Sequence, residues 1–276
     1  MKHWISFPGL GIEAFPVDRV AFELFGRQIM WYGVIICIGM ILSVLYAKWR
    51  FKKEGFTDDQ FYNYVIFLIP ISVVCARLYY VIFDPTPNYN SFYDVIAIWE
   101  GGIGIYGGII GGAIVSVVYA KVTKKPILRV LDCVAPAVMI GQFIGRWGNF
   151  INAEAHGGTT SLPWRMGIAE YVERVPYNEA LAECYHPTFL YESLWNMLGF
   201  ALLHFVMIKR KRFDGQFAFF YLAWYGFGRG FIEILRSDSL EIFGMKVSAI
   251  VGFGCAAIFG VLFFVMLFRS KKTVKE

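Results

Sequence analysis

Residues 141 to 158, GQFIGRWGNFINAEAHGG, crowd an arginine, two asparagines, a glutamate and a histidine between glycines at the end of an apolar segment, where they could do chemistry. If a helix continues through them, Arg146 and Asn149 are neighbours at i, i+3, and Glu154 lies about 80° around the helix from Arg146. The glycines would let a backbone or a ligand come close. Two interpretations stand: a helix junction tied by Arg–Glu and Asn–backbone bonds, or a site for chemistry.

A second polar set falls in the apolar segment FYLAWYGFGRGFIEILR. At helical spacing, Tyr225, Arg229, Glu233 and Arg236 point into one sector of about 80°. A charged arginine at mid-span costs about 2.5–3.5 kcal/mol on insertion scales. An Arg229–Glu233 ion pair that pins helices together would explain two of these residues. Two arginines exceed one glutamate, however, and an anionic ligand could supply the balance.

The segment HPTFLYESLWN brings His186 to the start of another apolar stretch and carries Glu192 and Asn196 into it. Proline at a helix start is common, and a histidine beside it is more often a cap or an interfacial residue than a catalytic one. Glu192 with Asn196 is predicted to join a buried polar network.

The segment EGGIGIYGGIIGG spaces Gly104, Gly108 and Gly112 four residues apart. Such spacing favours close packing of two helices on that face. Tyr106 lies on the same helix, and its hydroxyl needs a partner if it is buried.

These residues must be positioned by membrane helices. Only 17% of the 276 residues are charged, against about a quarter in soluble proteins. A spanning helix needs about 20 mostly apolar residues. The sequence supplies this length seven times, which predicts an all-α integral membrane protein with spans near 29–47, 61–83, 103–120, 130–145, 189–208, 215–235 and 247–268.

The distribution of positive charge predicts the orientation. Sixteen of the 26 lysines and arginines fall in four segments of one side, four in each, whereas eight are spread over the longer segments of the other. The basic side is expected to be cytoplasmic, with the N-terminus outside and the C-terminus inside. The net charge of +5 is then a topology signal, and no nucleic-acid partner is expected.

One membrane domain is expected over residues 1–276, with residues 146–188 forming a small external head between the fourth and fifth spans. The start of the chain lacks the features of a cleaved signal peptide, so the first span is expected to be retained. The five cysteines occur singly, without metal-like spacing, and neither a metal nor another cofactor is expected.

GRWGNFINAEAHG matches, at every specified position, the pattern G-R-x-G-N-F-x-N-x-E-x-x-G that marks prolipoprotein diacylglyceryl transferases. Three further stretches resemble the same family in the same order: WYG at 31–33, HPTFLYE at 186–192 and YGFGRGFIEILR at 225–236. The resemblance covers essentially the whole chain.

The resemblance implies an enzyme of the bacterial cell membrane whose active site faces the outer leaflet. It would transfer the diacylglyceryl group of phosphatidylglycerol to the lipobox cysteine of a prolipoprotein, which is tethered by its signal peptide, and release glycerol phosphate. Arg146, Arg229 and Asn149 would steady the departing phosphate. Glu154 and Glu233 would orient the arginines. The catalytic candidates are Arg146, Arg229, Tyr106, Asn149 and Glu154. The candidates for substrate binding are Tyr32, Gly157, Tyr225, Glu233, Arg236, His186 and Glu192.

The sequence departs from the family at Tyr106, where many members have a histidine often proposed as the base. Tyrosine ordinarily titrates near pH 10, which makes it a poor base at neutral pH. Another group or water would then take the thiol proton. The rival hypothesis is a seven-span transporter or lipid-binding protein that holds an anion without reacting it.

Overall fold

A computed structural model describes residues 2–84, 89, 91–170, 182–237, 241–242 and 244–273. The chain divides into two compact units, each described here by itself. The first joins residues 1–45 to residues 135–276, and the second comprises residues 46–134.

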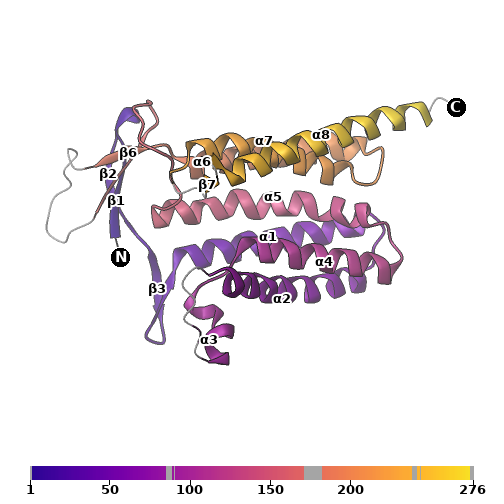
Figure 1. The fold of residues 1–276 in the computed structure, drawn as a ribbon, viewed down its shortest axis with the longest axis horizontal. Helices are drawn as coiled ribbons and strands as arrows, with labels where there is room; N and C mark the ends of the chain where they lie inside the picture. Colours follow the sequence, from indigo (N-terminus) through magenta and orange to yellow (C-terminus); the bar gives the residue numbers. More distant parts are fainter. Residues whose placement is uncertain are drawn as a thin grey trace. The chain divides into compact units, whose positions relative to one another are not determined.

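The described chain is mainly helical (Figure 1). Its long helices are α1 (Trp31–Lys53), α2 (Asp58–Phe83), α4 (Ile105–Thr123), α5 (Ile127–Asn152), α6 (Thr188–Ala201), α7 (Gln216–Leu235) and α8 (Val247–Thr273). Helix α6 continues through a π-helical turn, Leu202–Met207, and a 3₁₀ turn, Ile208–Arg210. Each of the seven apolar segments found in the sequence therefore forms a helix.

Six of the described helices are long and apolar enough to cross a membrane: α1, α2, α4, α5, α6 with its extension, and α8. Helix α7 falls outside this set because Arg229 and Glu233, together with its glycines and polar aromatics, reduce its apolar character. These helices indicate a multi-pass membrane protein.

A four-stranded antiparallel sheet lies in the first unit, beyond the ends of α5 and α6 (Figure 1). Its order is β2 (Ile12–Asp18), β1 (Lys2–Phe7), β5 (Met166–Glu170) and β6 (Glu183–Tyr185). Ile5, Val17 and Met166 pack with Phe189 of α6 in a buried cluster. The sequence predicted an external head at residues 146–188. It did not predict that an N-terminal strand would pair with a strand of that segment. Residues 171–181 of that segment lie outside the described residues.

Short elements complete the described chain. The hairpins are β3 (Val20–Leu24) with β4 (Arg27–Met30), and β7 (Glu241–Ile242) with β8 (Met245–Lys246). The short helices are a 3₁₀ turn at Pro8–Leu10, α3 (Phe92–Ile96) and a second 3₁₀ turn at Ile98–Glu100.

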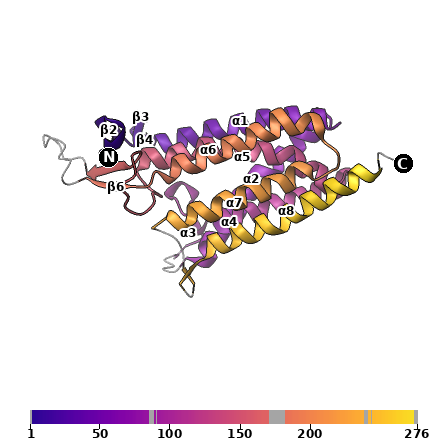
Figure 2. The same cartoon turned by 90° about the horizontal axis from the view of Figure 1, so that it is seen from above.

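Helices α7 and α8 run side by side (Figure 2), and glycines set their spacing. A Cβ on Gly226 would lie 2.6 Å from the carbonyl oxygen of Gly252, and one on Gly230 would lie 2.7 Å from the Phe253 ring. This close contact fixes one side of α7 against α8.

In the second unit α4 packs on α2, but on a different glycine face from the one predicted. A Cβ on Gly107 would lie 2.2 Å from the carbonyl oxygen of Cys75, and one on Gly111 would lie 2.9 Å from the Cys75 Cβ. Gly108 and Gly112 have ordinary space around them. On a helix, residues at i, i+3 and i+7 cover a narrower stripe than residues at i, i+4 and i+8. Gly104, Gly107 and Gly111 have the first spacing, and they form the face that packs closely on α2.

Arg77, a charged residue of α2, is buried in the second unit. Its guanidinium donates four hydrogen bonds of 2.6 to 2.8 Å to backbone carbonyl oxygens of Asp94, Val95, Gly101 and Gly102. The charge is thus used to hold the segment that leads into α4.

Candidate active site

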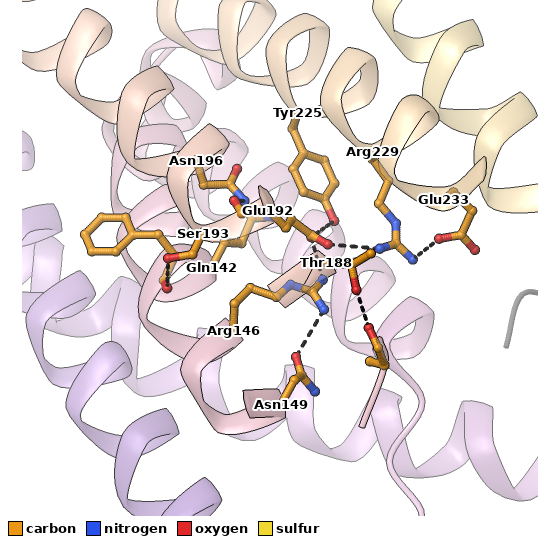
Figure 3. A network of polar contacts seen from close by, with 12 residues as sticks. Gln142, Arg146, Asn149, Thr188, Glu192, Ser193, Asn196, Tyr225, Arg229 and Glu233 are labelled. Atoms are coloured by element: carbon orange, nitrogen blue, oxygen red, sulfur yellow. Dashed lines mark hydrogen bonds and ion pairs between the residues drawn. The ribbon is translucent and has the colours of Figure 1, made fainter. Parts of the chain in front are cut away.

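The predicted polar residues of the first unit gather where α5, α6 and α7 meet (Figure 3). Helix α5 runs to Asn152, beyond the predicted end of the fourth span at residue 145, so Arg146 and Asn149 lie on one helix face. Helix α6 supplies Glu192 from its second turn, and α7 supplies Tyr225, Arg229 and Glu233.

The centre of the network is the carboxylate of Glu192, whose side chain is only 3% exposed. Arg146 Nη2 lies 2.5 Å from its Oε1, and Arg229 Nη1 lies 3.0 Å from its Oε2. Tyr225 Oη donates to the same Oε1 at 3.4 Å. One buried carboxylate therefore fixes two guanidiniums from different helices.

Arg229 lies between two carboxylates, because its Nη2 is 2.6 Å from Glu233 Oε2. Arg236 Nε is 3.9 Å from the same oxygen. The i, i+4 pair anticipated in the sequence is present. The inference of an uncompensated charge on this helix needs correction, because Glu192 of α6 supplies a second carboxylate.

The two guanidiniums nevertheless keep capacity for a ligand. Each guanidinium has five N–H donors. Arg146 uses Nη2 for Glu192 and Nη1 for Asn149, and Arg229 uses Nη1 for Glu192 and Nη2 for Glu233. The Arg146 and Arg229 side chains are 22% and 17% exposed. Planar guanidiniums that are held in place by buried carboxylates and keep further N–H donors suit bidentate binding of a phosphate.

Among the described residues, Glu154 is linked to Arg146 through Asn149. Arg146 Nη1 donates to Asn149 Oδ1 at 3.2 Å, and Asn149 Nδ2 donates to Glu154 Oε1 at 3.0 Å. Asn152 Nδ2 donates to the same oxygen at 3.2 Å. The direct Arg146–Glu154 pairing considered from the sequence does not form, because α5 ends at Asn152 and Ala153 turns into the left-handed region with φ of 49°.

The segment that follows α5, which contains Ala155, Gly157 and Gly158 and is called the strap here, is hydrogen-bonded to the start of α6 and to the end of α7. Gly157 N donates to the His186 carbonyl at 2.9 Å, and Gly158 N donates to the Leu235 carbonyl at 2.8 Å. Thr188 Oγ1 donates to the Ala155 carbonyl at 2.6 Å. A Cβ on Gly157 would lie 2.6 Å from the Cβ of His186, so a larger residue would push the strap away.

Two further candidates border the network. His186 Nδ1 lies 3.3 Å from Tyr191 Oη, and that hydroxyl accepts a bond of 2.6 Å from Trp164 Nε1, so His186 lies outside the carboxylate–guanidinium cluster. Tyr32 of α1 covers Gly148, where a Cβ would lie 2.6 Å from its ring.

Tyr106 belongs to the second unit and is described there by itself. It lies in the first turn of α4, is 46% exposed, and has its ring 6.0 Å from that of Tyr79. The structure therefore brings together Arg146, Asn149, Glu192, Tyr225, Arg229 and Glu233, with Glu154 and Arg236 at the margins.

Reasoning from the sequence missed several polar residues of the same region. Gln142 precedes Arg146 by one turn and Tyr221 precedes Tyr225 by one turn, and the two side chains are bonded to each other at 3.0 Å. Ser193 Oγ donates to the Phe143 carbonyl at 2.8 Å. The i, i+4 spacing from Arg146 and Tyr225 was the available signal for the first two.

In the described part of the chain, no three His, Cys, Asp or Glu side chains gather as a metal site requires. The chemistry that this geometry offers is electrostatic: fixed cations able to bind a phosphate and to stabilise negative charge that develops on it.

The sequence is similar to those of known proteins. The family model described as prolipoprotein diacylglyceryl transferase matches residues 19–266. The phosphatidylglycerol–prolipoprotein diacylglyceryl transferase of Oceanobacillus iheyensis is 43% identical over 233 residues, 83% of this chain and 81% of that protein. The enzyme of the same name from Clostridioides difficile is 39% identical over 256 residues, 93% of this chain and 98% of that protein. The chain belongs to the prolipoprotein diacylglyceryl transferase family.

Proposed function

We propose that this chain transfers the diacylglyceryl group of phosphatidylglycerol to the lipobox cysteine thiol of prolipoproteins, the first step of bacterial lipoprotein maturation. The sulfur forms a thioether bond to the glycerol carbon that carries the phosphate ester. The carbon–oxygen bond breaks, glycerol phosphate leaves with the electron pair, and the thiol proton passes to water. The observation that carries this proposal is the pair of guanidiniums fixed by Glu192.

The arginines supply the main catalytic contribution in this mechanism. Negative charge grows on the phosphate as the carbon–oxygen bond breaks, and donors already held in place stabilise it without reorganisation. Arg146 and Arg229 act as the phosphate clamp. Asn149 adds a neutral donor, because only one of its amide N–H groups is used by Glu154. Glu233 orients Arg229, and Glu154 orients Asn149.

The proposed topology has seven spans in one membrane domain, with the N-terminus outside and the C-terminus in the cytoplasm. The basic segments after α1, α4, α6 and α8 support it. The clamp lies at the end of α5, α6 and α7 that would face the outer leaflet of the cell membrane, and residues 146–188 form the external head. The lipid would enter sideways between helices, and the prolipoprotein would arrive tethered by its signal peptide.

The test is turnover by the purified protein in phosphatidylglycerol micelles with a lipobox peptide. Mass spectrometry should show the peptide cysteine gaining the diacylglyceryl mass, and a peptide with serine in its place should gain nothing. The seven-span transporter or lipid-binding protein, which the comparisons do not favour, would bind the lipid without any mass gain. Absence of a gain across several detergents would refute the proposed function.

A further inference from the structure

A layer of neutral polar side chains lies one helical turn from the charged cluster, on the side away from the sheet. Gln142 precedes Arg146 on α5, Asn196 follows Glu192 on α6, and Tyr221 precedes Tyr225 on α7. We call Gln142, Asn196 and Tyr221 the neutral layer. One helical turn rises about 5.4 Å. The neutral layer therefore lies about that far from the charged cluster, nearer to the middle of the three helices.

The neutral layer is bonded to the charged cluster. Gln142 Nε2 donates to Tyr221 Oη at 3.0 Å, and the Tyr221 ring stacks on that of Tyr225 with centroids 5.9 Å apart. Asn196 Nδ2 donates to the Glu192 backbone carbonyl at 2.9 Å. Figure 3 draws Gln142 and Asn196 in the same network as Glu192.

Two oxygens of the layer lack a hydrogen bond from any described residue: Gln142 Oε1 and Asn196 Oδ1. Asn196 is 0% exposed, so its oxygen is fully removed from solvent. Buried polar atoms in folded proteins nearly always have a partner. Two unpartnered acceptors beside a cluster able to bind phosphate therefore point to a ligand that carries hydrogen-bond donors.

We propose that the neutral layer binds the hydroxyl groups of the lipid's polar headgroup and selects a glycerol headgroup over others; this rests on the proposed function. With the phosphate held by Arg146 and Arg229, a three-carbon alcohol esterified to it can extend across the step of about 5.4 Å to Gln142 and Asn196. A hydroxyl both donates and accepts, so it complements an amide in either of its two rotations. Gln142 and Asn196 are then specificity-determining residues for the leaving group.

The test compares phosphatidylglycerol with phosphatidylpropanol, whose headgroup has the same carbon chain without hydroxyls. Both lipids lose an alkyl phosphate of similar acidity, so their difference in kcat/KM isolates the hydroxyl contacts. The wild-type protein is expected to prefer phosphatidylglycerol by about tenfold or more, as a loss of 1.4 kcal/mol per contact implies. Gln142→Met and Asn196→Leu should each reduce this preference several-fold by slowing only the phosphatidylglycerol reaction.

Ser193→Ala is the matched control. Ser193 lies on α6, as Asn196 does, but its hydroxyl already donates a hydrogen bond to the Phe143 carbonyl. This variant should keep the wild-type preference. Variants that slow both lipids equally would show a structural role and overturn the proposal. If the wild-type protein reacts equally fast with the two lipids, the headgroup proposal is overturned without any variant, whereas the proposed transferase function still stands. No mass gain with either lipid would refute the proposed function and this inference together.

Discussion

Glu192 Oε1 on α6 lies 2.5 Å from Arg146 Nη2 on α5, and the carboxylate is almost completely buried. The same carboxylate also holds Arg229, so its loss would leave two cations without their shared partner. Removing one partner of a buried ion pair is strongly destabilising, whereas the pair itself adds little. If the two guanidiniums bind a phosphate as proposed, Glu192 would fix their positions for it.

Glu192→Gln is expected to reduce kcat/KM about a hundredfold, because the amide cannot accept from both arginines. The freed guanidiniums should at the same time bind anions more tightly, so inhibition by added glycerol phosphate should strengthen. Enzyme kinetics with and without glycerol phosphate check both effects. Weaker inhibition together with normal turnover would show that Glu192 does not restrain the clamp.

Arg146→Ala and Arg229→Ala should each lower kcat by about 10²–10³-fold while the protein still inserts, since each removes one donor to the developing charge. Arg→Lys at either position should not restore the rate, because an ammonium cannot form a planar fork on a phosphate. Rates are measured on protein that elutes as wild type on size exclusion. Full activity in the lysine variants would mean that charge alone suffices.

Tyr106→His should keep substantial activity, and Tyr106→Phe should lose most of it, if the side chain orients the substrate through one hydrogen-bond donor. Histidine retains such a donor and phenylalanine does not. The measurement is a pH–rate profile of wild type beside Tyr106→His. A limb that moves by several pH units with the substitution would show that residue 106 itself exchanges a proton in the reaction.

Helical periodicity in the sequence was enough to bring Tyr225, Arg229 and Glu233 onto one face, because local geometry fixes that relation. It could not show that Glu192 binds both arginines, since that depends on how three helices pack. The i, i+4 spacing from Arg146 could have drawn attention to Gln142, but it could not show that the side-chain oxygen of Gln142 is buried without a hydrogen bond from a described residue.

Long-range strand pairing was the larger omission. Strand β1 pairs with β5, so that His3 lies opposite Glu170, and neither segment carries a pattern that identifies the other. The glycine face of α4 was misplaced because a row of glycines four apart drifts around the helix, whereas contact with α2 selects the straighter stripe.

The sheet should become less stable as the pH falls below about 6.5, because of His3. His3 is 6% exposed, and neither ring nitrogen is hydrogen-bonded by a described residue. Burial, followed by the positive charge of Arg19, lowers the pKa of His3. The unfolded strand then binds a proton at a pH where the folded strand does not, so acid favours unfolding. This destabilisation by His3 disappears above the pKa of the unfolded histidine.

Hydrogen exchange of the β1 and β5 amides, corrected for intrinsic rates, should show protection lost between about pH 7.5 and 5.5 in wild type. His3→Gln, which cannot titrate, should remove that loss; an unchanged pH dependence in this variant would assign the effect to another group.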